Sequence, residues 1–154
     1  LVLILIFMLI YYKASGFIAN FALIWNILLV LAVLASLQAT LTLPGIAALI
    51  LTVGMSIDAN VIIFERIREE LRKGKTPKAA VDAGYQRALT TIIDANITTV
   101  IAALVLYQFG TGPIRGFATV LFWGIVISMF TAIFVTRTIF NTFTRRKGLQ
   151  RLSI

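Results

Sequence analysis

Residues 44–64 are PGIAALILTVGMSIDANVIIF, an apolar run whose only charged residue is Asp58. A segment inside a bilayer must satisfy its own backbone hydrogen bonds, so a run of this length predicts a transmembrane helix. Pro44 suits the first turn of that helix. The following residues, ERIREELRK at 65–73, are charged but still favour a helix. We therefore expect the helix to continue beyond the membrane into water.

The composition of the whole chain also indicates that lipid is its solvent. Of its 154 residues, 60% are apolar and 13% are charged, against about 45–50% and about 25% in soluble domains. The chain contains neither cysteine nor histidine, which removes disulfides, thiolate and imidazole metal ligands, and the usual neutral-pH switch. We expect no cofactor and no metal, and any proton chemistry must use carboxylates.

Apolar segments along the chain predict an all-α membrane protein, a bundle of five transmembrane helices in one domain spanning residues 1–154. The expected helices cover residues 1–12, 17–38, 45–71, 88–109 and 116–140. The first is shorter than the roughly 20 residues that cross a membrane. We therefore expect it to be the end of a span that begins earlier in the chain.

The connections between these helices have their own signals. Residues 39–43 predict an uncharged loop, and Gly74 is suited to end a helix. Thr76 and Pro77 predict a helix cap and a first helical residue. The residues after Pro77, up to 87, alternate apolar and charged side chains, which predicts a short amphipathic helix along the membrane surface.

Lysine and arginine are distributed unevenly between the two sides of the predicted bundle. Thirteen of the 14 lie on the side of the connecting stretch 65–87 and the tail 141–154, whereas Arg115 alone lies on the other. Because cytoplasmic segments carry an excess of basic residues, we expect the stretch 65–87 and the C-terminus to be cytoplasmic. Residue 1 would then lie near the outer side, with the preceding chain arriving from outside. The net charge of +8 is thus a topology signal, and we expect no nucleic acid partner.

Two of the six acidic residues, Asp58 and Asp94, lie inside predicted spans. Both occur in the sequence Ile-Asp-Ala-Asn, and both lie seven residues from a charged boundary, or about 10 Å inside the membrane at 1.5 Å per residue. A charge in hydrocarbon costs on the order of 2.5–3.5 kcal/mol on insertion scales, so both are candidate proton-relay residues. The sequence leaves open whether they face each other. Facing carboxylates would be suited to load and release a proton.

The residues near Asp58 on its helix point in different directions. Gly54 and Ile62 share its face, whereas Asn60 points about 200° away. Asn60 fits an interhelical hydrogen bond better than a place in a relay. An alternative for Asp58 itself is a structural role.

Polar residues also lie near Asp94. Thr91 and Thr98 lie close to its face, where hydroxyl groups permit close helix contact and relayed hydrogen bonds. Asn96, like Asn60, fits an interhelical hydrogen bond better than a relay. The alternative for Asp94 is that it caps a broken helix or bonds a neighbouring hydroxyl group.

The remaining polar features predict structure rather than chemistry. Four acids, Glu65, Glu69, Glu70 and Asp82, alternate with arginine and lysine and predict a solvated charge lattice, with a docking surface as the alternative. Small residues recur at every fourth position of the last span and predict a helix-packing stripe. Its members are Gly124, Ser128, Ala132 and Thr136. The sequence contains no phosphate loop, nucleophile triad or metal cluster.

Taken together, several motifs resemble the SecD family of the bacterial protein-export machinery. They are LPGIA at 43–47, GMSIDANV at 54–61, FERIREEL at 64–71, IDANITT at 93–99, GTGPIRGF at 110–117, SMFTA at 128–132 and RLSI at 151–154. The related SecF family would have Asn-Asp-Thr where this chain has Asp58, Ala59 and Asn60. The resemblance extends over nearly the whole chain.

This resemblance implies a protein of the resistance–nodulation–division superfamily in the bacterial inner membrane. The chain would be spans two to six of a six-helix transporter half, preceded by a periplasmic domain that handles the unfolded exported polypeptide. Implied partners are SecF, the SecYEG channel, the SecA motor and the lipid bilayer. The implied role is proton-driven transport rather than enzymatic catalysis. Asp58 matches the carboxylate of the family's proton path, and the partner arginine belongs to SecF.

Two other functions remain compatible with the sequence. One is half of a proton-coupled efflux transporter for small molecules, which would use the same kind of intramembrane carboxylate. The other is a non-transporting scaffold subunit, in which the acids only hold helices together.

Overall fold

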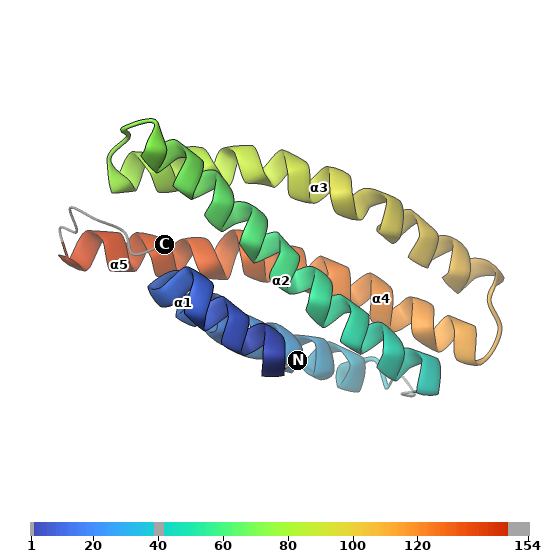
Figure 1. The fold of residues 1–154 in the computed structure, drawn as a ribbon. Coiled ribbons are helices and arrows are strands. Elements are labelled where there is room, and N and C mark those ends of the chain that lie inside the picture. The colour runs from blue at the N-terminus through green and yellow to red at the C-terminus, as the bar shows by residue number, and fades with distance from the viewer. Residues whose placement is uncertain (1, 39–41, 148–154) are drawn as a thin grey trace.

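The computed structural model describes residues 2–38 and 42–147, and these residues are almost entirely helical (Figure 1). Four of the described helices are long and apolar enough to cross a membrane: Ser15–Ser36, Leu43–Arg72, Pro77–Phe109 and Pro113–Thr142. A fifth, shorter helix precedes them. The expected fold class, an all-α membrane bundle, is confirmed. Residues 39–41 of the predicted loop at 39–43 lie outside the described residues. The RLSI motif at 151–154 lies wholly outside them.

The first element, α1 (Val2–Ser36), consists of two antiparallel helices joined at Lys13, whose backbone has a φ of 47°. The side-chain amide of Asn20 donates to the carbonyl oxygen of Leu5 at 3.1 Å and ties the two helices together. Gly16 lies directly against the backbone of Met8, where a Cβ would collide. Glycine is therefore needed at this reversal.

The central element is α2 (Leu43–Arg72), which packs against α1, α3 and α4. The hydroxyl oxygen of Thr42 caps it by accepting from the amide of Gly45 at 3.2 Å. At the other end the hydroxyl group of Tyr12 donates to Glu65 at 3.1 Å, which joins α1 to α2. Every other long helix is thus positioned against α2.

The third element, α3 (Pro77–Phe109), is one continuous helix capped by Thr76. The separate surface helix predicted after Pro77 is therefore wrong, because the chain continues from it into the membrane span without a break. The connecting stretch 65–87 leaves the helices only at residues 73–76, so the predicted helical extension of the span at 45–71 is confirmed. Buried Val81 and Tyr85 pack this part of α3 against α2 instead of against a membrane surface.

The last span combines α4 (Pro113–Phe130), a five-residue π-helical turn η1 (Thr131–Val135) and α5 (Thr136–Lys147). The predicted stripe of small residues on this span is buried, which confirms its packing role. Its members are Gly124, Ser128, Ala132 and Thr136. At Gly124 a Cβ would lie 2.6 Å from Cγ2 of Thr52, so α2 and α4 approach closely there.

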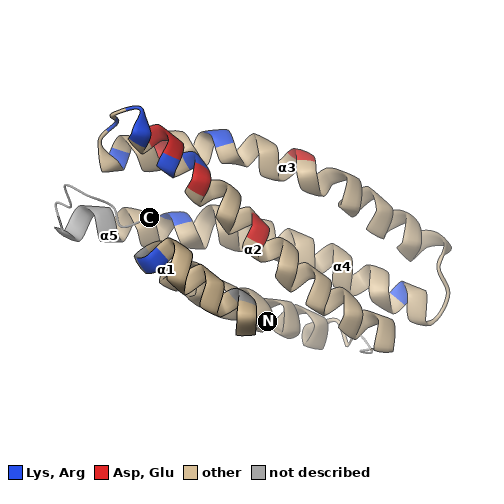
Figure 2. Ribbon diagram, in the orientation of Figure 1, with Lys and Arg blue, Asp and Glu red and all other residues tan. Residues whose placement is uncertain are grey.

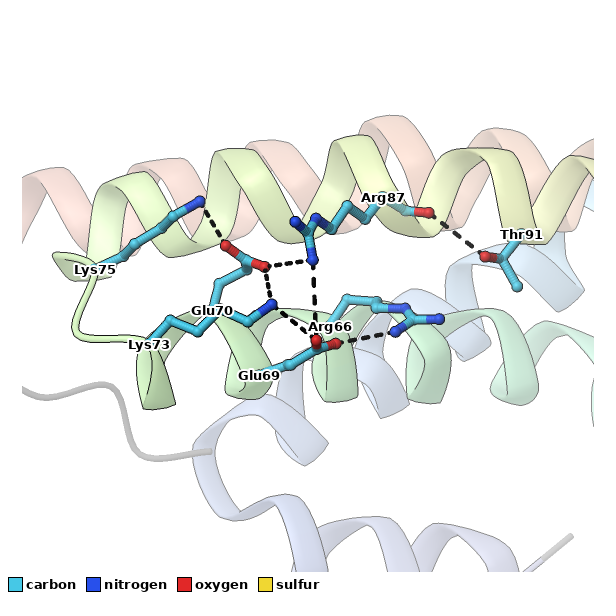
Figure 3. Close-up of polar contacts among 7 residues, drawn as sticks. All are labelled: Arg66, Glu69, Glu70, Lys73, Lys75, Arg87 and Thr91. Carbon is cyan, nitrogen blue, oxygen red and sulfur yellow. Dashed lines mark hydrogen bonds and ion pairs between the residues drawn. The ribbon is translucent and has the colours of Figure 1, made fainter.

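Charged residues concentrate at one end of the bundle (Figure 2), which we call the basic end. It contains Lys13, the end of α2 and the start of α3. Glu70 is completely buried there, although the sequence indicated a solvated lattice. Figure 3 shows Glu70 surrounded by Lys73, Lys75 and Arg87.

The contacts of Glu70 join α2 to α3. Its carboxylate pairs with Lys75, with Lys73 at 3.1 Å and with Arg87 of α3 at 3.0 Å. Its neighbour Glu69 pairs with Lys73 at 2.8 Å but is 41% exposed. Hydrogen bonds to Glu69 and Glu70 raise the pKa of Lys73 above its ordinary value. The buried carboxylate thus compensates three cations at the α2–α3 junction.

Replacing Glu70 with Gln is expected to destabilise this junction more than replacing Glu69 with Gln. The buried site would lose the charge that compensates its cations, whereas the Glu69 pairs are screened by solvent. The measurement is the thermal unfolding midpoint of each purified full-length variant. Equal midpoints for the two variants would contradict the role assigned to Glu70.

Gly84→Ala is expected to lower the free energy of unfolding by about 1–3 kcal/mol, the usual range for overpacking. The new Cβ would lie 2.6 Å from Cγ1 of Ile67 and 2.9 Å from its backbone. Ala79→Val adds bulk to an exposed position of the same helix and serves as the control. A Gly84→Ala protein as stable as wild type would show that α2 and α3 are not held this close.

Candidate functional site

Asp58 lies on the surface of the bundle, within the apolar part of α2. Its neighbours Ile57, Ala59 and Asn60 are 7%, 4% and 1% exposed, whereas Asp58 itself is exposed. Helical periodicity produces this division, because residues on the two sides of Asp58 turn toward the other helices. Gly54, one turn earlier, has nothing within 4 Å of the position of a Cβ. The face that carries Asp58 is therefore open within this chain.

Within the part of the chain that the structure describes, the carboxylate of Asp58 has no hydrogen bond and no ion pair. Every other described acid except Asp94 has an ion pair at the basic end. Figure 2 shows this contrast between the mixed charges at that end and the isolated acidic positions along α2 and α3. Asp58 is thus a carboxylate in an apolar span whose own chain supplies no counter-charge.

Asp94 lies on α3 and is also exposed, again without a hydrogen bond or ion pair among the described residues. Only 11% of the apolar window of α3 is buried, against 44% in α2 and 50% in the last span. The helix that carries Asp94 is therefore the most peripheral of the three. The structure does not bring Asp94 and Asp58 into direct contact. No described neighbour forms the hydrogen bond with Asp94 that its alternative structural role would require.

The polar residues expected to support Asp94 bond within their own helix. The side-chain amide of Asn96 donates to the carbonyl oxygen of Ile92 at 2.8 Å. The hydroxyl group of Thr91 donates to the backbone carbonyl oxygen of Arg87 at 3.5 Å. Thr98 is exposed. Among the described residues Asn96 thus bonds only within its own helix, and its interhelical bond stays a prediction.

Asn60 behaves differently, and its predicted interhelical role is confirmed. Its Oδ1 accepts a hydrogen bond from the hydroxyl group of Thr136 in α5 at 3.2 Å. Its Nδ2 donates to the carbonyl oxygen of Ser56 at 3.2 Å. All three residues are at most 1% exposed. Two residues beyond Asp58, α2 is therefore bonded to the last span through the core.

Sequence reasoning missed two polar groups in this core. The Oδ1 atom of Asn26 in α1 and the Oγ1 atom of Thr131 in η1 are buried without a hydrogen-bond partner in the described structure. An asparagine inside an apolar run was the available signal for Asn26. Thr131 gives no comparable signal, because the π-helical turn around it has no sequence motif.

Comparisons with known proteins place this architecture in a family. The family described as "Protein export membrane protein SecD/SecF, C-terminal" matches residues 1–146. A relative from Magnetococcus marinus, "Protein translocase subunit SecD", is 58% identical over 99% of this chain and 29% of its own length. A relative of the same name from Calditerrivibrio nitroreducens is 60% identical over 98% of this chain and 29% of its own length.

A solved structure supports the same conclusion. The crystal structure of SecDF, a translocon-associated membrane protein from Thermus thermophilus, matches with a TM-score of 0.92 and 41% identity. The match covers 97% of this chain and 21% of that one. The chain thus spans less than a third of the relatives that it matches. The apolar helices, the family match and these relatives show that the chain is a multi-pass membrane protein that belongs to the SecD/SecF C-terminal family of protein export membrane proteins.

Proposed function

We propose that this chain is the membrane part of a protein translocase subunit that uses the proton-motive force for late steps of protein export. Asp58 is the group that takes up a proton from the outer side and releases it to the cytoplasm. The observation that carries this proposal is the position of Asp58, a carboxylate in an apolar span without a counter-charge from its own chain. Relatives named as translocase subunits favour export over small-molecule efflux.

The open face of α2 supports a second helical unit as the neighbour of Asp58. An ionised carboxylate that faced lipid would be costly, and intramembrane charges therefore face a protein interior or a partner charge. Gly54 leaves room on this face for close approach of another helix. The partner that we propose is SecF, which would supply the cationic group. SecYEG, SecA and the unfolded polypeptide would act on the complete complex, the last through a periplasmic domain.

Protonation can drive movement because it changes the cost of burying Asp58. The ionised form requires a counter-charge, whereas the neutral form tolerates an apolar neighbour. Each form therefore favours a different packing of α2 and α3 against the partner half, and proton passage alternates the two packings. In this account no covalent step occurs and no cofactor is needed.

The proposed orientation has the basic end in the cytoplasm of a bacterial inner membrane. Lys13, Arg87 and Arg137 belong to this end, and Arg137 pairs there with Asp82 at 3.4 Å. Arg115, at the opposite end, would lie on the periplasmic side. Basic residues on the cytoplasmic side follow the positive-inside rule.

Asp58→Asn is expected to reduce export to the rate measured after an uncoupler has collapsed the proton gradient, because the amide cannot ionise. The measurement is proton-dependent completion of export in inverted vesicles that contain the full-length complex. Asp82→Asn, which changes a half-buried acid outside the apolar part of the spans, is the control and should retain proton-dependent export.

The level of assembled complex must be measured in the same vesicles. Loss of export with normal assembly supports Asp58 as the coupling residue. Unchanged export would contradict the proposal and transfer the role to Asp94. Loss of assembly would instead favour the scaffold function.

A further inference from the structure

The last span departs from a regular α-helix where it passes Asn60. Residues 131–135 form the π-helical turn η1, and the amide of Thr136 donates to the carbonyl oxygen of Thr131, five residues earlier. Such single π-turns are rare in proteins and often occur at functional sites. One face of this turn lies in the protein core, since Thr131, Ala132 and Thr136 are at most 1% exposed, whereas Phe134 faces outward.

The π-helical turn determines the direction of Thr136. At 100° per residue, the twelve residues from Gly124 to Thr136 would rotate the side chain of Thr136 about 120° from the direction of Gly124. A π-turn adds one residue to a turn, so Thr136 takes about the angle of the eleventh residue, roughly 20° from Gly124. The turn thus brings a hydroxyl group onto the face that contacts α2.

The hydroxyl group of Thr136 has two acceptors and only one proton. Oδ1 of Asn60 lies 3.2 Å away, and the carbonyl oxygen of Thr131 lies 3.3 Å away. Loss of the bond to Asn60 therefore leaves the hydroxyl group paired within its own helix. Breaking a buried hydrogen bond is costly when a donor or an acceptor is left unpaired. Here the donor keeps a partner, so the cost of exchange falls on Oδ1 of Asn60, for which the described residues supply no second donor.

We propose that Asn60 and Thr136 are positioning residues whose hydrogen bond holds the Asp58 segment of α2 against the last span and exchanges when Asp58 changes its charge. This inference rests on the proposed function of Asp58. Asp58 and Asn60 lie on opposite faces of the same helical turn. A movement of α2 that re-seats Asp58 against its partner must therefore also move Asn60 relative to Thr136. The exchange conveys that movement to α5 and the basic end.

The first test compares variants at one position. Thr136→Val keeps the shape but removes the hydroxyl group, and it should lower proton-dependent export by roughly threefold to tenfold, as expected for one interhelical hydrogen bond in a membrane. Thr136→Ser should restore it. Thr138→Val is the matched control, because Thr138 is exposed and its hydroxyl group donates at 2.7 Å to the carbonyl oxygen of Phe134 in the same span. Equal export by the Ser and Val variants would overturn the proposal.

The second test does not depend on export. The chain has no cysteine, so spin labels on Arg72→Cys and Thr142→Cys can report the distance between α2 and α5 in a full-length complex from which any cysteines outside this chain have been removed. Asp58→Asn should change the distance distribution between the two labels. Thr136→Val, in a protein that keeps Asp58, should change it as well. Distributions that stay as in wild type in both variants would overturn the proposal.

The two tests separate this inference from the proposed function. If Asp58→Asn left export unchanged, the role of Asp58 in export would fail. The effect of Thr136→Val on the label distance, with its rescue by Thr136→Ser, would still establish that this hydrogen bond sets the spacing of α2 and α5.

Discussion

The cost of a charge in hydrocarbon is the constraint on which this structure depends. Asp58 interrupts an otherwise apolar helix, and its own chain supplies no counter-charge within the described residues. The rest of the bundle is arranged so that α2 is central and fixed on its inner face, while its Asp58 face stays open. A helix that is rigid on one face and incomplete on the other is suited to answer a change of charge on the open face.

The two ends of α2 are fixed by different physical means. At the basic end, buried Glu70 of α2 pairs with cations from α3 and from the short connection between α2 and α3. Toward the other end, Thr52 meets Gly124 in a close apolar contact. Between them, Asn60 and Thr136 form a hydrogen bond, and the hydroxyl group of Thr136 has a second acceptor in the carbonyl oxygen of Thr131. The middle of α2 is therefore held by a hydrogen bond whose donor, Thr136, has a second acceptor within the last span.

Much of this arrangement could be predicted from the sequence, because membrane helices have strong signals. Long apolar runs predicted the helical bundle, and the spacing of small residues predicted the buried stripe, although Thr136 reaches that stripe only through the π-helical turn. The opposite faces of Asp58 and Asn60 follow from helical periodicity alone. These predictions succeeded because each depends on local sequence and on the geometry of one helix.

Other features depend on contacts between helices and escaped prediction. Glu70 resembles its neighbour Glu69 in sequence, and only the packing of α3 buries it. The π-helical turn has no motif, and the residues after Pro77 look amphipathic because their apolar side packs on α2 rather than on lipid. The proposed proton role of Asp58 likewise requires a neighbour outside this chain, so the sequence of the chain alone could only make it a candidate.

Proton flux through the full-length complex in proteoliposomes tests the central claim most directly. With an imposed membrane potential, the account predicts inward proton flux for wild type and none for Asp58→Asn at equal amounts of assembled complex. It also predicts that Asp82→Asn conducts like wild type. Proton flux through Asp58→Asn at the wild-type rate would contradict the account, because Asp58 would then not be the group that carries the proton.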